Sequence, residues 1–156
     1  MTDDAKDYIA TLSEGYPHFL QELAYHAYEE DRDHTVDLTD VINSLFKEHG
    51  AFDQLGRKYF DQFYTAPSSD DYRLVLKTMA KHLDRWIQRA DIIAESGLKQ
   101  GTVDNALRAL KAKTIVLQNE MKSGQYRLPT QSFAVWINAR EVAEKSAERL
   151  DRPSLF

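Results

Sequence analysis

Seven polar side chains in the second half of the chain are of the types that recognise duplex DNA. Gln and Asn side chains pair with adenine edges, Arg pairs with guanine, and Lys and Thr contact phosphates. The seven residues are Lys99, Gln100, Thr102, Asn105, Arg108, Lys111 and Lys122. We treat them as the candidate DNA-binding site.

Two helices separated by a tight turn are predicted to carry most of these side chains. Ile92 and Ile93 belong to a brief helix that ends at Gly97, and "GLKQ" forms the turn. A second helix is expected over residues 101–112, with four apolar residues facing inward: Val103, Ala106, Leu107 and Leu110. Helix, short turn and helix together form the skeleton of a helix-turn-helix.

The hydrophobic period then falls from about 3.6 to 2, which indicates strands. "TIVLQNE" and "QYRLP" are two short strand candidates joined by "MKSG", where Gly124 allows a hairpin turn. A helix-turn-helix followed by a hairpin is a winged helix, and Lys113, Lys122 and Arg127 would flank its recognition helix. A last helix over residues 130–150 carries Phe133, Trp136 and Ile137 on one side.

The charge of this region gives only modest support to DNA binding. Residues 86–130 contain 7 Lys and Arg against 4 Asp and Glu, and Asp104 shares the exposed helix face, where it would repel phosphate. We therefore expect weak, salt-sensitive DNA binding by a monomer. Docking of a protein by the same winged helix stays open.

The first half of the chain is predicted to be a bundle of helices. Four segments have apolar residues at helical spacing: Ala5, Tyr8, Ile9 and Leu12; Phe19, Leu20, Leu23, Ala24 and Ala27; Val41, Ile42, Leu45 and Phe46; Phe52, Leu55, Tyr59, Phe60 and Phe63. The stretch "TAPSSDD" reads as a hinge, and a fifth helix after it would bury Tyr72, Val75, Leu76, Met79 and Leu83. We expect a mainly α protein with an acidic helical bundle, 1–66, and a winged-helix domain with a C-terminal helix, 67–156.

Charge and composition support two units in a soluble protein. The net charge of −5 divides into −9 for residues 1–66 and +4 for residues 67–156, which indicates different partners for the two halves. The chain has no cysteine, and it shows neither a secretory signal nor an apolar run of membrane-spanning length. We expect a cytoplasmic protein without a membrane partner.

Residue patterns that carry catalysis are missing from the sequence. It has neither a Gly-x-x-x-x-Gly-Lys-Ser/Thr phosphate loop nor a Gly-x-Ser-x-Gly elbow. Glu22, His26 and Glu30 share one helix stripe and could offer oxygen and nitrogen ligands to a metal, but charged residues at this spacing usually form a solvated face. We expect neither an enzyme nor a metal site in this chain.

Several segments in order resemble the C-terminal region of AAA+/STAND-type P-loop ATPases of the archaeal type. "SEGYPHFLQELAYHAYE" looks like their lid, while "DYRLVLKTMAKH", "IIAESGLKQGTVDNALRALKAKTIVLQ" and "YRLPTQSFAVWI" are similar to their winged helix. The resemblance implies that Gly15, Tyr16 and Pro17 face the nucleotide of an ATPase core, which would hold the ATP and magnesium that this chain lacks. Pro17 and His18 stand where initiator ATPases have a sensing arginine, and Thr114 stands where a glycine is usual.

Taken together, these patterns favour the non-catalytic C-terminal portion of a P-loop ATPase, whose winged helix binds DNA or a protein partner. The partners implied are duplex DNA, an ATPase core or another protein. One alternative is a stand-alone winged-helix transcription regulator, for which dimerisation would add affinity by pairing two recognition helices. Another is a protein-interaction module that docks through Asp104 and the aromatic helix over residues 52–63.

Overall fold

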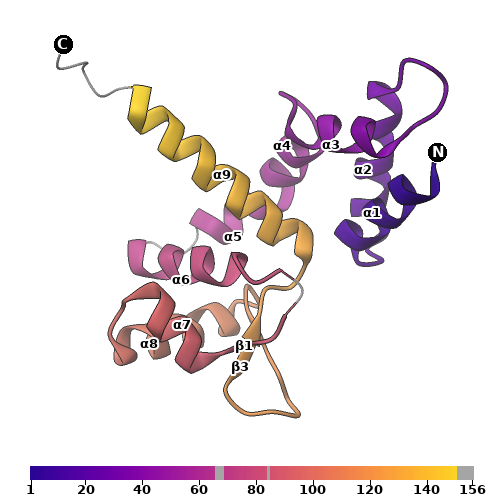
Figure 1. The fold of residues 1–156 in the computed structure, drawn as a ribbon. Helices are drawn as coiled ribbons and strands as arrows, with labels where there is room; N and C mark the ends of the chain where they lie inside the picture. Colours follow the sequence, from indigo (N-terminus) through magenta and orange to yellow (C-terminus); the bar gives the residue numbers. More distant parts are fainter. Residues whose placement is uncertain (66–68, 84, 151–156) are drawn as a thin grey trace. The chain divides into compact units, whose positions relative to one another are not determined.

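The computed structural model describes residues 1–65, 69–83 and 85–150, and these residues are mainly helical with a small antiparallel sheet (Figure 1). Backbone contacts divide the chain into two compact units. Unit 1 comprises Met1–Ala66 and Thr130–Ser132, and unit 2 comprises Pro67–Pro129 and Phe133–Phe156. The hinge expected around Pro67 lies largely outside the described residues. Within the described ranges, every helix is too short or too polar to cross a membrane.

Unit 1 is a bundle of short helices that follow one another closely along the chain. Its elements are α1 (Asp3–Ser13), α2 (Pro17–Glu30), α3 (Leu38–Phe46), α4 (Ala51–Leu55), η1 (Gly56–Phe60) and α5 (Asp61–Thr65). The helix α2 packs against both α1 and α3. The core of the bundle consists of apolar side chains that are almost fully buried: Ile9, Leu12, Leu23, Val41, Leu45 and Leu55.

The helices α1 and α2 meet at a sharp corner. Glu14 and Gly15 both adopt the left-handed conformation, with φ of 46° and 78°, and Tyr16 N–H donates to the Ser13 carbonyl. Pro17 then opens α2 as its first residue, a position where the missing N–H is not needed. The sequence predicted both the turn at Gly15 and the proline start.

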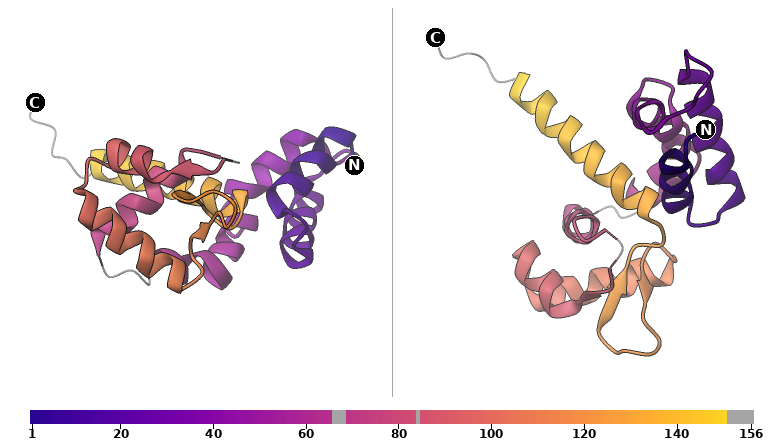
Figure 2. Two further views of the ribbon diagram at one scale, coloured as in Figure 1. Left: turned by 90° about the horizontal axis from the view of Figure 1, so that it is seen from below. Right: turned by 45° about the vertical axis from the view of Figure 1, so that its right-hand side comes forward.

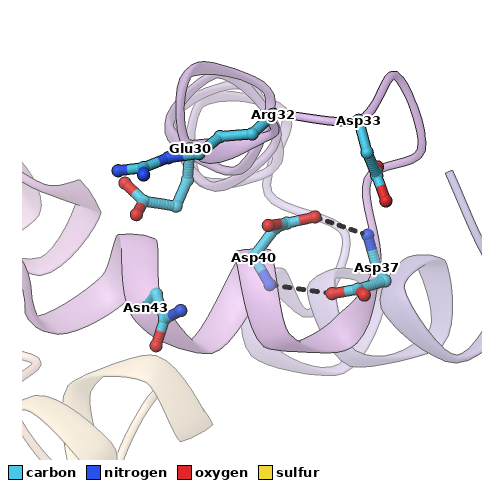
Figure 3. A pocket seen from close by; sticks show the side chains of 6 residues that line it. All are labelled: Glu30, Arg32, Asp33, Asp37, Asp40 and Asn43. Atoms are coloured by element: carbon cyan, nitrogen blue, oxygen red, sulfur yellow. Dashed lines mark hydrogen bonds between the residues drawn. The ribbon is translucent and has the colours of Figure 1, made fainter.

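The start of α3 is fixed by a reciprocal pair of hydrogen bonds. The Asp37 carboxylate accepts the Asp40 N–H at 3.0 Å, and the Asp40 carboxylate accepts the Asp37 N–H at 3.0 Å (Figure 3). This capping box satisfies two backbone donors that the first helical turn would otherwise leave free. The predicted start near residues 37–39 agrees with this geometry.

A widened turn interrupts the aromatic helix that the sequence predicted over residues 52–63. In η1 the hydrogen bonds skip one more residue than in an α-helix, so that Asp61 N–H donates to the Gly56 carbonyl. The extra residue rotates the following turn, and Tyr64 is buried where Phe63 was expected. Phe63 is half-buried instead.

Three apolar side chains of unit 1 that were expected inside are exposed: Leu20, Ile42 and Phe46. The covered stripe of α3 runs through Val41 and Leu45, and the two exposed residues of α3 each lie one position, or about 100°, further round the helix. The Phe46 ring still packs edge-on against Phe52, with ring centroids 5.5 Å apart. A bundle of this size covers only one narrow stripe of each helix.

Unit 2 combines four helices with three short strands in its described part. These are α6 (Asp70–Ala80), β1 (Ile87–Gln88), α7 (Arg89–Ser96), α8 (Gln100–Ala112), β2 (Leu117–Gln118), β3 (Gln125–Arg127) and α9 (Gln131–Leu150), of which the first two residues of α9 group with unit 1. The sheet is antiparallel in the order β1-β3-β2, with Ile87 opposite Tyr126 and Leu117 opposite Arg127. The sequence analysis did not predict β1, because two residues are too short to show a period. Figures 1 and 2 show the β2–β3 connection extending beyond the helices of this unit.

The core of unit 2 lies among α6, α7, α8 and the first half of α9. Its fully buried side chains include Val75, Leu76, Ile92, Leu107, Leu110 and Ile137. Asn138 on α9 donates to the Ala80 carbonyl at 2.9 Å and so satisfies the end of α6. Leu83, which was expected inside, is exposed because α6 ends at Ala80.

Candidate nucleic-acid interface

A three-residue turn, Gly97–Lys99, joins α7 to α8. Gly97 has φ of 70°, and its N–H donates to the Ile93 carbonyl, which ends α7 in the left-handed conformation that glycine adopts most readily. All four inward residues predicted for the second helix are buried in α8: Val103, Ala106, Leu107 and Leu110. Their burial fixes which face of α8 points to solvent.

The solvent face of α8 carries most of the residues expected to recognise DNA. Five of them are exposed at the start and along this face: Lys99, Gln100, Asn105, Arg108 and Lys111. Thr102 is half-buried, and Lys122 is exposed in the β2–β3 connection. Gly101, also on this face, adds no side chain that would keep a ligand away from the helix.

The first turn of α8 has free backbone donors and no acidic residue. Lys99 occupies the N-cap position and makes no side-chain capping bond, so the first N–H groups of the helix have no side-chain acceptor. The positive charge of Lys99 is also repelled by the positive end of the helix dipole. The arrangement is unfavourable for folding and favourable for binding an anion.

The acid on this face is neutralised by an arginine from the neighbouring helix. Arg89 donates through Nε and Nη2 to the two carboxylate oxygens of Asp104, the latter at 2.8 Å (Nη2 to Oδ2). The hydrogen bond from Arg89 is the main reason that the pKa of Asp104 lies below its usual range. We expected Asp104 to repel phosphate, but its charge is already matched within the protein.

A hollow of about 320 Å³ lies beside α8, where the helix faces the sheet. Its lining combines three cations, one acid, an amide, a phenol and an apolar floor: Arg89, Arg108, Lys111, Asp104, Gln118, Tyr126 and Leu107. Lys111 Nζ donates to the Gln118 side-chain oxygen at 2.6 Å, which links α8 to β2.

Five of the lining residues were not among the seven predicted site residues: Arg89, Asp104, Leu107, Gln118 and Tyr126. Arg89 comes 15 positions before Asp104, and only the packing of α7 on α8 brings the two together. Gln118 and Tyr126 lie on paired strands and are registered opposite each other. The presence of an arginine at the start of α7 was visible in the sequence, but its partner was not.

The corner Gly15–Pro17, expected to face a nucleotide in a parent ATPase, lies on the surface of unit 1. Gly15 and Pro17 are exposed, and the Tyr16 side chain is 52% exposed. The Tyr16 ring packs at a tilt against Phe19, with centroids 5.6 Å apart. These residues are thus accessible to a ligand or partner.

The two carboxylates on the α2 stripe are each held by a lysine, and His26 lies beside only one of them, so the three side chains are not grouped around one point. Glu22 accepts from Lys58 Nζ at 2.6 Å and has His26 at 3.5 Å, whereas Glu30 accepts from Lys47 Nζ at 2.7 Å. The hydrogen bond from Lys58 is the main cause that lowers the pKa of Glu22. In the described residues no three His, Asp or Glu side chains are arranged to hold a metal ion.

An acidic hollow of about 410 Å³ lies in unit 1 (Figure 3). Its lining includes Glu30, Arg32, Asp33, Asp37, Asp40 and Asn43. Asp37 and Asp40 point toward each other in the capping box, and Glu30 is paired with Lys47. Most of the negative charge in this hollow is therefore used inside the bundle.

Comparisons with protein-family models, with curated proteins and with solved structures gave no match to this chain.

Proposed function

We propose that unit 2 is a winged helix that binds duplex DNA, with α8 entering the major groove and the β2–β3 connection following the backbone. The observation that carries this proposal is the solvent face of α8. It presents cations and amides while its one acid, Asp104, is neutralised by Arg89. The free N–H groups at the start of α8 supply further donors for a phosphate.

The arrangement of unit 2 agrees with this mode of binding. The helix α8 follows a three-residue turn, and the connection between β2 and β3 carries the exposed Lys122. The exposed amides of Gln100 and Asn105 are suited to reading base edges, and the lysines are suited to phosphates. Only a few phosphates would be neutralised by one copy, so binding is expected to be weak and salt-dependent.

The wider role that we propose is that of the non-catalytic C-terminal portion of a P-loop ATPase. The exposed corner at Gly15, Tyr16 and Pro17 supports it, since a lid residue that faces a nucleotide must be accessible. In this role the ATPase core would supply ATP hydrolysis, and the present chain would supply DNA contact.

Fluorescence anisotropy with labelled duplex DNA tests the proposal directly. The full chain should bind at about 50 mM salt and lose most of its affinity by about 200 mM. The double variant Lys99→Ala/Asn105→Ala should bind at least tenfold more weakly. Lys6→Ala, which removes the same charge from α1 in unit 1, is the matched control and should bind like the unaltered chain.

Equal losses in the control and the double variant would mean that only net charge matters, and the α8 interface would be wrong. Absence of binding at the lowest salt would also contradict DNA as the partner. The exposed face of α8 would then be a protein-docking surface.

A further inference from the structure

The hollow beside α8 is lined by one stripe of that helix and by the sheet. Asp104, Leu107, Arg108 and Lys111 are spaced i, i+3, i+4 and i+7 and so lie on a single side of α8. Asn105 lies one position, or about 100°, further round the helix from Asp104 and does not line the hollow. The residues on the solvent side of α8 thus fall into two groups. One group lines the hollow, and the other, which includes Asn105, forms the outer crest of the helix.

The hollow carries an excess of positive charge. It has three cations, Arg89, Arg108 and Lys111, against the single carboxylate of Asp104. Asp104 is engaged by two hydrogen bonds from Arg89, which leaves Arg108 and Lys111 to set the charge that a ligand meets. Its lining therefore favours an anion.

The residues that line the hollow also have unused hydrogen-bond donors. Arg108 has no hydrogen bond or ion pair within the described residues, and Arg89 uses two of its five N–H groups on Asp104. Lys111 uses one of its three N–H groups to donate a hydrogen bond to the Gln118 side-chain oxygen, and this bond holds the ammonium group between α8 and β2. A planar guanidinium and a positioned ammonium group are the donors that proteins use for phosphate.

We infer that this hollow binds a single phosphate group, held by Arg108 and Lys111, with Arg89 kept in position by Asp104. The inference rests on the proposed function for its source of phosphate, which is the backbone of the bound DNA. It changes the role of Arg108, since the sequence alone assigned that residue to a guanine. Arg108 would instead fix the register of α8 on the backbone, and the crest residue Asn105 would read bases.

Titration with inorganic phosphate tests the hollow without DNA. Two-dimensional NMR of the full chain, with chloride at matched ionic strength as the reference, should show saturable shifts at Arg108 and Lys111 with millimolar phosphate. Arg108→Ala and Lys111→Ala should weaken this binding about tenfold or more. Lys113→Ala is the matched control, because Lys113 is an exposed lysine at the end of α8 that does not line the hollow.

Duplex DNA of several sequences then distinguishes the sources of the phosphate. Arg108→Ala should weaken binding to every sequence by a similar factor and reduce the salt slope by about 1, while Asn105→Ala should change the preference among sequences. Saturable phosphate binding without DNA binding would support the hollow for free or ligand-borne phosphate and reject the proposed function. Loss of affinity in Arg108→Ala for only those sequences with one particular guanine, or an equal loss of inorganic phosphate binding in Arg108→Ala and Lys113→Ala, would overturn the inference.

Discussion

The helices α3 and α8 begin in opposite ways. At the start of α3, the Asp37 and Asp40 side chains cap each other's backbone, and an acidic residue lies at the positive end of the helix dipole. At the start of α8, Lys99 leaves the backbone donors free and adds a positive charge to the same end. Side chains satisfy the first backbone donors of α3, whereas those of α8 have no side-chain acceptor and stay accessible to solvent or a ligand.

The same contrast extends to the charged side chains of the two units. In unit 1, Glu22 and Glu30 are each paired with a lysine. In unit 2, Asp104 is paired with Arg89, while Arg108 and the ammonium group of Lys99 make no hydrogen bond or ion pair within the described residues.

Placing an acidic N-cap on α8, like the one at the start of α3, should have the largest effect on DNA binding. Lys99→Asp would supply an N-cap and stabilise unit 2 by about 1 kcal/mol, because Asp accepts a backbone hydrogen bond and complements the helix dipole. It should also weaken DNA binding by more than tenfold, since a cation is replaced by an anion at the interface. Thermal unfolding and anisotropy measure the two effects, and a stabilised variant with unchanged DNA affinity would contradict the proposed interface.

Removing the cap of α3 should affect stability alone. Asp37→Ala is expected to lower the free energy of unfolding of unit 1 by about 1 to 2 kcal/mol, because the Asp40 N–H loses its acceptor. Hydrogen exchange of the α3 amides measures this loss, with Asp7→Ala on the exposed side of α1 as the control. Unchanged exchange in α3 would show that the capping box adds nothing.

A substitution just after the end of α8 should raise the free energy of unfolding by about 1 kcal/mol. Thr114 has φ of 59°, a left-handed conformation that costs a β-branched residue about 1 to 2 kcal/mol and a glycine almost nothing. Thr114→Gly should therefore raise the free energy of unfolding by about 1 kcal/mol after the greater freedom of glycine in the unfolded chain is counted. Denaturant unfolding measures it, and Thr114→Ala, which keeps a Cβ, should recover little of the gain.

The smallest expected effect is on stability, it depends on pH, and it comes from the acids of unit 1 that are paired with lysines. Glu22 has a lowered pKa in the folded protein because Lys58 donates to its carboxylate, so its stabilisation is present above the usual glutamate pKa of about 4.3. This stabilisation is lost as the pH falls through the lowered value. Glu22→Gln should cost less than about 1 kcal/mol at pH 7 and nothing well below pH 4. Glu29→Gln, which replaces an exposed glutamate on the same helix, is the matched control.

Most helices of this protein could be predicted from the sequence, because each buries a stripe of apolar residues. The four inward residues of α8 and the turn at Gly97 are examples, and so is the proline start of α2. The strand β1 escaped detection because two residues cannot show an alternating pattern. Tyr64 was missed because periodicity assumes an uninterrupted helix.

The candidate site was only half visible in the sequence. Residue type and spacing identified the exposed crest of α8, since that helix has a clear buried face. The pairing of Arg89 with Asp104, and the grouping of Arg108 with Tyr126, depend on how α8 packs against α7 and the sheet. Sequence spacing within one element cannot predict contacts between elements.

The widened turn at Gly56–Phe60 also has a consequence for the length of the chain. An α-helix accommodates one extra residue here by opening a single turn, so the segment can be understood as a tolerated insertion. Deleting one residue in this turn should restore a continuous α-helix from α4 into α5 and leave Phe60 and Tyr64 four residues apart. Such a shortened chain would return the later part of the helix to the phase of its first turn.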